Sequence, residues 1–411
     1  MGTVHKALKV RIYPTQEQEV LLSKSFGCSR FLFNQMLAER IAVYDSLKEG
    51  RRALYDHKYK TEKQYKEEFE WLSEVDAKAL QAVTANLIAS YSNFFNSVRG
   101  IRKGTKVGFP KFKKRMSFAS FGAGNNNGTT KVDYEKRLIQ IPKLGKVRFR
   151  DNRSRKFEGK ILRYSISKSS TGKYFASVLY ECDLVLKPII LDEVNPEKVI
   201  GLDMSLDKFY VDNLGNSPNY RRLYRESEEK LKKLQRKASK KQKGSKNRQK
   251  AQLRVSKVHE KIANSRKDFT RKLSTSLIRN YDVVVIESLS LAGMAQGLKL
   301  GKSVMDLGYS SFVSQLQYKS LWNNKIVIEA DKWFASSKTC SFCGFKKKDL
   351  LLQERSWVCP NCQKSHDRDQ NAGQNLKNFG ILQLGLEQLE NKPVEKLMLK
   401  VNSMKQEASW S

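Results

Sequence analysis

Four cysteines in the last quarter of the chain have the spacing of a metal site. Cys340 and Cys343 form one C-x2-C pair, and Cys359 and Cys362 form a second pair after an intervening x15. Each pair can present two thiolates from one tight turn, and Zn²⁺ prefers a tetrahedron of such ligands. A redox dithiol and unrelated buried thiols are the alternatives, while too few other cysteines remain for a disulfide framework. The spacing therefore predicts one structural zinc ion.

Three carboxylates have positions that suit a second kind of metal centre. Asp203 and Glu287 each end an apolar run that is typical of a buried strand, and Asp369 follows the cysteine pairs at the head of an expected helix. Acids at the ends of adjacent strands meet at one sheet edge, where they repel each other unless a divalent cation neutralises them. Two Mg²⁺ ions about 4 Å apart, or Mn²⁺ ions, can activate water and stabilise the leaving oxygen in phosphodiester cleavage. We therefore predict a catalytic two-metal centre at these acids.

Each acid alone is weak evidence for that centre. An aspartate at a strand end is commonly a turn residue, and Glu287 alone could be a surface group. Asp207 and Asp367 lie near enough in sequence to support the metal ligands, but helix capping or solvation is the favoured role for each. The order of strand with Asp, strand with Glu and helix with Asp is RNase H-like, and it is the combination that favours catalysis.

The composition indicates a polyanionic partner. The chain has 411 residues, enough for two or three domains, and a net charge of +36 with the basic residues spread along it. Nucleic acid is the favoured partner for such an excess. No run approaches a membrane span, and the first residues lack the apolar core of a signal peptide. We expect a cytoplasmic protein that binds nucleic acid and no membrane.

The first half of the chain carries strand patterns on either side of helical ones. Residues 7–13 alternate as a half-buried strand, and residues 15–44 and 76–98 have apolar residues at helical spacing. Residues 138–182 return to alternating strands with turn signals between them. This order predicts a small β-barrel interrupted by a helical bundle.

Two basic regions are candidates for contact with nucleic acid. Residues 100–114 are either a disordered linker or a grip for a phosphate backbone. Residues 221–272 form a helical region, broken near 240–245, in which basic residues far outnumber acidic ones. Solvated surface helices are the alternative there. The candidate contacts in the two regions are Lys111, Lys113, Lys240, Lys241, Arg248 and Arg254.

The rest of the second half reads as strands alternating with helices. Residues 198–203 and 282–287 are expected strands of a sheet, the latter buried on both faces, and residues 325–330 are expected to be another central strand. Residues 295–308 are Gly-rich and expected to be flexible. Ser310 is expected to cap the helix that follows.

Six segments together are highly specific for one family. They are residues 71–76, 107–112, 201–209, 285–289, 340–344 and 366–372. These segments closely resemble TnpB, a family of insertion-sequence-encoded RNA-guided DNA endonucleases related to the type V CRISPR effectors. The resemblance extends over nearly the whole chain.

The resemblance implies an α+β multidomain fold. It consists of a wedge β-barrel with an inserted helical recognition bundle, and an RNase H-like RuvC α/β nuclease domain with an inserted zinc module. The implied divisions are 1–14 (first barrel strand), 15–115 (helical recognition domain), 116–190 (remainder of the barrel), 191–335 (RuvC domain with the basic arm), 336–366 (zinc-binding target-nucleic-acid module), 367–380 (last acid and helix of the RuvC domain) and 381–411 (C-terminal tail). Disorder is one interpretation of the tail, since the guide RNA gene often overlaps the end of the reading frame in this family.

The resemblance also implies partners and roles. The acids would be the RuvC ligands of two Mg²⁺ ions, and a monomeric protein would carry a guide RNA made from the transposon end. That RNA would pair with one strand of double-stranded target DNA, in the cytoplasm and at the nucleoid of a prokaryote. The protein would read a short adjacent motif in the duplex. Candidates for that contact are Tyr55, Gln81, Asn125 and Asn126, and for each the alternative is an ordinary surface polar residue.

Two residues depart from the family pattern. Ser205 stands where the family often has glycine, and Gly373 stands where alanine is usual. Both leave the metal ligands untouched, so they put local geometry in doubt rather than chemistry.

Other classes of function remain as alternatives. An RNA-guided DNA-binding repressor that does not cut is one, but it would have no need of three acids. RNase H-like transposases place their acids in the order Asp, Asp, Glu, whereas here the order is Asp, Glu, Asp. A plain single-strand-binding protein would need no acids at all. The sequence favours a metal-dependent, RNA-guided DNA endonuclease.

Overall fold

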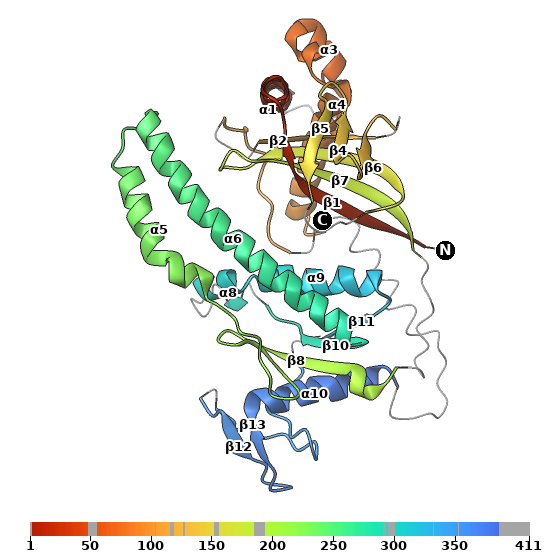
Figure 1. Ribbon diagram of the computed structural model, residues 1–411, viewed down its shortest axis with the longest axis vertical. Coiled ribbons are helices and arrows are strands. Elements are labelled where there is room, and N and C mark those ends of the chain that lie inside the picture. The colour runs from red at the N-terminus through yellow and green to blue at the C-terminus, as the bar shows by residue number, and fades with distance from the viewer. Residues whose placement is uncertain are drawn as a thin grey trace. The chain divides into compact units, whose positions relative to one another are not determined.

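The protein divides into two compact units. The structure is a computed structural model that describes residues 2–47, 56–102, 104–115, 119–125, 128–151, 156–184, 194–290, 293–294, 301–331, 333–351 and 353–385. The units are Met1–Val185 with Gln252–Lys257, and Leu186–Ala251 with Val258–Ser411. Figure 1 shows the elements of both units. No helix among these described residues is both long and apolar enough to cross a membrane.

A curled antiparallel sheet of seven strands dominates the first unit (Figure 1), with the order β2-β6-β7-β1-β5-β4-β3. The opening strand β1 lies inside this sheet, because it pairs with β7 along its length and with β5 at its end. Its Leu8, Val10 and Ile12 are buried while the residues between them are exposed, the period of two that a half-buried strand requires. The strands are β1 Gly2–Tyr13, β2 Ala119–Gly124, β3 Lys131–Asp133, β4 Leu138–Ile141, β5 Gly145–Arg150, β6 Lys160–Lys168 and β7 Tyr174–Leu184.

Helices follow the first strand and precede the others, as the wedge barrel with an inserted bundle requires. They are α1 Gln16–Leu47, α3 Glu62–Glu68, the 3-10 helix η1 Glu70–Glu74 and α4 Ala77–Val98. Asp76 caps α4 by accepting from the Lys78 N–H at 3.1 Å, and it also accepts from the Tyr164 hydroxyl on β6 at 2.9 Å. One carboxylate thus fixes the start of a helix and ties that helix to the sheet.

The described part of the basic segment after α4 is packed on the bundle. The Phe109 ring meets Tyr91 and Phe94 edge-on at 5.4 and 5.5 Å. Lys113 exchanges two hydrogen bonds with the Asn34 side chain, at 2.8 and 3.0 Å, through its backbone N–H and C=O. Residues 104–115 therefore follow a fixed path along the helices instead of forming a free linker.

The second unit is built on a mixed sheet with the order β11-β10-β8-β9. Its strands are β8 Val199–Ser205, β9 Phe209–Asp212, β10 Val283–Glu287 and β11 Ile326–Ala330. β8, β10 and β11 run parallel, and β9 returns antiparallel to β8. The flanking helices are α5 Leu223–Ser239, α6 Lys246–Asn280, α8 Gly301–Leu307, α9 Tyr309–Trp322 and α10 Arg368–Gln383.

Helices cover both faces of this sheet (Figure 1). The even-numbered residues of β8 and β10 pack with α6 and α9, through Ile200, Leu202, Val284, Ile286, Leu277, Ile278, Phe312 and Leu316. The odd-numbered residues of these two strands pack with α10, through Val199, Val283, Val285, Leu376 and Ile381. This arrangement confirms the predicted α/β layer, and it determines which face of the sheet each side chain of β8 and β10 is on.

Three sequence expectations were wrong in this unit. β11 is an edge strand of the described sheet and only partly buried, not a central strand. The Gly-rich segment before α9 contains the helix α8, whose buried Asp306 accepts from the Tyr224 N–H at 3.0 Å and lies 3.6 Å from Arg266. The cap of α9 is Gly308 with a φ of 65°, so Ser310 lies inside the helix.

Candidate functional site

The three predicted acids lie at one edge of the second unit's sheet. Asp203 lies near the end of β8, and Glu287 is the last residue of β10, the adjacent parallel strand. The register pairs Ile286 with Leu202, so the next residue on each strand is one of the two acids. Both are odd-numbered and face the side of the sheet that α10 covers. Asp369 lies in the first turn of α10 and completes the group.

The electrostatics indicate that Glu287 and Asp369 act on Asp203. Burial raises the pKa of Asp203 well above its ordinary value, and the charges of Glu287 and Asp369 raise it further. Burial also raises the pKa of Glu287. Two cations lie near Asp369, whose carboxylate is 3.5 Å from Arg355 Nη1 and 4.0 Å from Lys208 Nζ. Such a group is held ionised most readily by a divalent cation, which suits Mg²⁺.

Carboxylates are the kind of ligand that Mg²⁺ prefers, and Mg²⁺ usually keeps several waters while it is bound through one or two carboxylates. Among the residues that the structure describes, the four cysteines are the group whose ligand atoms all lie within 4.8 Å of one another, and the three acids do not form such a cage. The acids therefore suit a hydrated ion better than one enclosed by protein ligands alone.

The two other acids near the centre, Asp207 and Asp367, have partners of their own. Asp367 is the N-cap of α10, accepting from the Gln370 N–H at 2.9 Å. Asp207 is exposed and paired with Arg222. The favoured interpretation, capping or solvation, is confirmed for Asp367 by this geometry.

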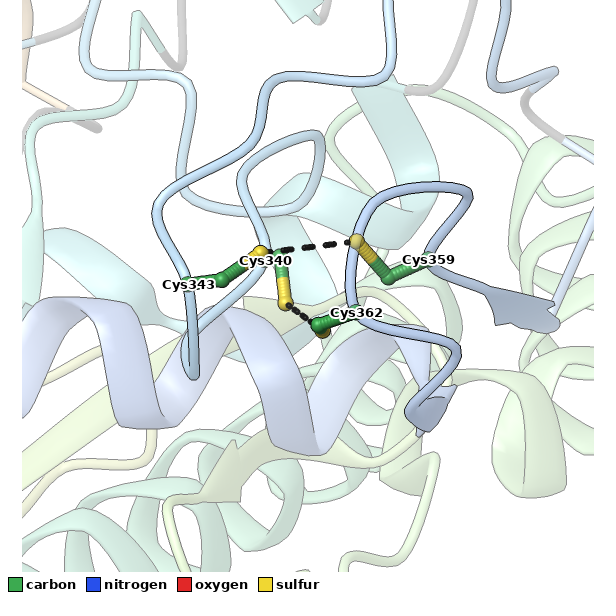
Figure 2. A group of neighbouring side chains, drawn as sticks. All are labelled: Cys340, Cys343, Cys359 and Cys362. Carbon is green, nitrogen blue, oxygen red and sulfur yellow. Dashed lines mark hydrogen bonds between the residues drawn. The ribbon is translucent and has the colours of Figure 1, made fainter.

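The four cysteines form the predicted cluster (Figure 2). Cys340 Sγ lies 3.7 Å from Cys362 Sγ, and Cys343 Sγ lies 3.6 Å from Cys359 Sγ. A tetrahedral zinc ion with Zn–S bonds of about 2.3 Å requires sulfur–sulfur distances of about 3.8 Å. The Asn361 side chain and the Phe345 backbone lower the pKa of Cys343 to about 6, which favours the thiolate that zinc binds. The cluster fits one zinc ion.

Asparagines of α10 fasten the first cysteine loop to the helix that carries Asp369. Asn371 accepts from the Ser341 N–H at 2.9 Å and donates to the Thr339 carbonyl at 2.7 Å. Asn375, one turn later, donates to the Thr339 and Ser336 carbonyls at 2.6 and 2.7 Å. Sequence reasoning missed this contact. The signal was two asparagines at i and i+4, which are poor helix formers unless their amides bond outside the helix.

Glycines let α10 lie directly on β8. A Cβ on Gly201 would lie 2.1 Å from the Gly373 carbonyl oxygen, and a Cβ on Gly373 would lie 2.8 Å from Asn213 N. Gly373 therefore departs from the family pattern for a packing reason, because it lies where α10 contacts the backbone at the end of β9. Ser205 lies at the end of β8 and bonds to the backbone of the turn after it.

We expect Gly201→Ala to weaken this contact and with it the acid centre. The added methyl must push α10 from the sheet, because its nearest neighbours are backbone atoms that cannot move aside. Overpacking of this kind costs about 1–3 kcal/mol, so the melting temperature should fall by several degrees. The control is Gly27→Ala, because a Cβ on Gly27 would have no neighbouring heavy atom within 4 Å. Gly172→Ala would be a poor control, because the φ of +83° at Gly172 strains any other residue. An unchanged melting temperature for Gly201→Ala would contradict the packing argument.

The predicted nucleic-acid contacts are distributed over both units. Gln81 is exposed on α4 and Lys111 is exposed beside Phe112. Lys113 places its ammonium 3.9 Å from the Phe33 ring centre, so it also supports the local fold. Asn125 is buried: its amide donates to the Thr130 and Ile161 carbonyls and accepts from the Thr130 N–H. Tyr55 and Asn126 lie outside the described residues.

The arm candidates lie around the junction of α5 and α6. Lys240 caps α5, Lys241 follows it, and Arg254 is exposed on α6. Arg248 donates to the Lys241 carbonyl at 2.8 Å and closes the turn between the helices. Apart from Arg248 these side chains are available to a polyanion, while Arg248 shapes the bend that presents them.

Three families match parts of the chain. A family described as "Probable transposase" matches residues 177–297, "Cas12f1-like, TNB domain" matches residues 309–376, and "Helix-turn-helix domain" matches residues 1–49. The last stretch folds here as strand β1 and helix α1. The second covers α9, β11, the cysteine cluster and the start of α10.

Whole-chain relatives carry a functional name. A Streptomyces pristinaespiralis protein named "Putative RNA-guided DNA endonuclease" is 31% identical over 93% of this chain and 90% of its own. An Escherichia coli (strain K12) protein of the same name, with the suffix InsQ, is 28% identical over 90% of this chain and 91% of its own. Among solved structures, a Cas12f1-sgRNA-target DNA complex matches with a TM-score of 0.51 at 14% identity, covering 92% of this chain and 99% of that one. The chain belongs to the TnpB family.

Proposed function

We propose that the protein is an RNA-guided DNA endonuclease that hydrolyses phosphodiester bonds at Asp203, Glu287 and Asp369. The single observation that carries the chemistry is that two strand-end acids face α10, whose first turn brings the third. Their mutual effect on the pKa of Asp203 supports the interpretation that they act as one group.

Each residue has a distinct part in the proposed reaction. The three carboxylates would hold two Mg²⁺ ions, which supply an activated water and neutralise the leaving oxygen. Burial and the charges of both other acids raise the pKa of Asp203, so a divalent cation would favour its ionised form, and we assign it as a metal ligand. Lys208 and Arg355 now balance the charge of Asp369, and near a bound strand they would meet the phosphate backbone instead. Zinc at the four cysteines would hold the module that sets Asp369 in place.

The proposed partners are a guide RNA from the transposon end and double-stranded DNA with a short adjacent motif. The exposed basic side chains of the α5–α6 arm would neutralise backbone phosphates, and the net charge of +36 supports a large contact with nucleic acid. Gln81 on α4 stays the described candidate for reading the motif. We propose one protein copy per RNA, acting at the nucleoid of a prokaryotic cell.

Sequencing of the RNA that co-purifies with the protein tests the guided function. The expected result is one defined transcript, and Mg²⁺ should then permit cutting of a plasmid that carries a sequence matching the guide part of that transcript. Recoding the guide part should move the cut to the newly matched plasmid, which is the control for guiding. Random RNA fragments, or cutting independent of the RNA sequence, would contradict the proposal. Sequence-specific binding of the plasmid without cutting would support the repressor alternative.

A further inference from the structure

One buried side chain beside the cysteine cluster has no part in the proposed chemistry. His366 is only 7% exposed, and its Nε2 lies 3.0 Å from Cys340 Sγ, which is itself 1% exposed. The imidazole also lies against the Trp357 ring, with 4.8 Å between ring centres and 38° between planes. The ring is therefore held on one side by an indole and directed at a sulfur on another.

The geometry argues against His366 as a zinc ligand. The four sulfurs already bring their atoms within 4.8 Å of one another, and His366 is not part of that group among the residues described. Their closest pairs are near the edge length of a ZnS₄ tetrahedron. A structural zinc ion has four ligands, so the imidazole lies just outside a complete set.

A hydrogen-bond donor beside Cys340 Sγ would stabilise a zinc-bound thiolate. A zinc-bound thiolate carries negative charge, and a buried one cannot take hydrogen bonds from water. Ligands of structural metals depend on neighbouring groups for their orientation, and loss of such a partner commonly costs about 10–100-fold in metal affinity. His366 is the side chain whose ring nitrogen lies within bonding distance of Cys340 Sγ.

His366 also lies close in sequence to the helix that carries Asp369. His366 lies on strand β13 Ser365–Asp367, which pairs with β12 Ser356–Val358, and it faces Trp357 directly in the register. The next residue, Asp367, caps α10, and Asp369 follows in the first turn. A bond from His366 to the sulfur thus joins the metal to the short strand that enters the acid-bearing helix.

We propose that His366 is a positioning residue whose Nε2–H donates a hydrogen bond to the zinc-bound Cys340 thiolate and so holds both the ligand and the strand leading to Asp369. The proposal rests on the zinc occupancy given under the proposed function. It does not depend on the nuclease assignment, because zinc retention can be measured without nucleic acid or Mg²⁺.

The test compares zinc loss from full-length variants to excess EDTA, followed as metal remaining on the protein. His366→Phe keeps a ring against Trp357 and removes the donor, while His366→Gln restores an N–H near the position of Nε2. His366→Phe should lose zinc about 10–100-fold more readily, and His366→Gln should recover most of the difference. His259→Phe, an exposed histidine on α6, is the matched control and should behave as the unsubstituted protein.

Several outcomes would overturn the proposal. Equal zinc retention by His366→Phe and the unsubstituted protein would show that the imidazole holds nothing. A ¹¹³Cd-substituted protein whose resonance lies with sites of three sulfurs and one nitrogen would make His366 a ligand. If His366→Phe fails to fold, His366→Leu, which also lacks a donor, is compared with His366→Gln: faster zinc loss from the Leu variant alone supports the donor, and equal retention by the two variants overturns it.

Discussion

Asp203→Asn should abolish DNA cleavage while leaving RNA and DNA binding unchanged. Asparagine keeps the size of the side chain but removes the charge that a metal ligand would need, so cleavage should fall by about 10³-fold or more. The side chain lies with Glu287 and Asp369 rather than on the basic surfaces, so binding should stay within about twofold of the unsubstituted protein. Single-turnover cleavage in Mg²⁺ and filter binding in EDTA measure the two effects separately.

The same substitution should stabilise the metal-free protein. Burial and the neighbouring acids raise the pKa of Asp203 above its unfolded value, so between the two values the folded state holds a proton that the unfolded state has lost. The free energy of unfolding therefore falls as the pH rises from the unfolded-state pKa to the folded-state pKa of Asp203. At neutral pH the buried acid centre consequently destabilises the fold. Asparagine removes this cost, so the melting temperature in EDTA should rise and the stabilisation by added Mg²⁺ should shrink.

Asp207→Asn is the matched control for both measurements. Asp207 lies on the turn after β8, four residues from Asp203, but it is exposed and paired with Arg222. Its variant should cut DNA at close to the unsubstituted rate and show no gain of melting temperature in EDTA. Persistent cutting by Asp203→Asn, or a lower melting temperature in EDTA, would remove Asp203 from the centre.

The parts of the site that could be predicted from sequence are those that short-range rules determine. Val283, Val284 and Val285 predict a strand buried on both faces, and the acid at its end then has a known direction. The two C-x2-C pairs likewise carry their geometry in their spacing. In both cases a few adjacent residues contain the whole signal.

The parts that could not be predicted depend on partners distant in sequence. β11 has the same apolar pattern as a central strand, and only the strand order places it at an edge. Helix α8 is stabilised by Asp306, which bonds to Tyr224 on α5, a contact that no local pattern shows. Asn371 and His366 bond to the cysteine loops across 30 and 26 residues, and although the asparagine pair suggests bonds outside the helix, no local pattern names the partner of either residue.

The cysteine module cannot hold its shape by packing alone. Among the described residues, its buried cluster consists of Cys340, Leu350, Trp357 and Cys359 with Cys362 against it, so two of these four buried members are proposed metal ligands. Apolar contact on that scale is far below what an independent fold needs. Structural zinc supplies about 10–16 kcal/mol in small finger peptides, which is the size of contribution that this module lacks.

Removal of zinc should therefore abolish cleavage by disturbing the position of Asp369. The effect is indirect, because none of the described cysteines contacts the acids. Without the metal, the loop from Ser336 to Ser341 loses the shape that Asn371 and Asn375 bind, and the first turn of α10 loses its support.

Cys343→Ser is the direct test, because Cys343 is exposed and its replacement removes a ligand without opening a core cavity. Hydrogen exchange should rise in residues 365–372 and cleavage should be lost, while exchange in β8 and β10 stays slow. Cys28→Ala, a cysteine outside the module, should retain zinc and activity. Full cleavage by protein that metal analysis shows to be free of zinc would break the connection between this module and the acid centre.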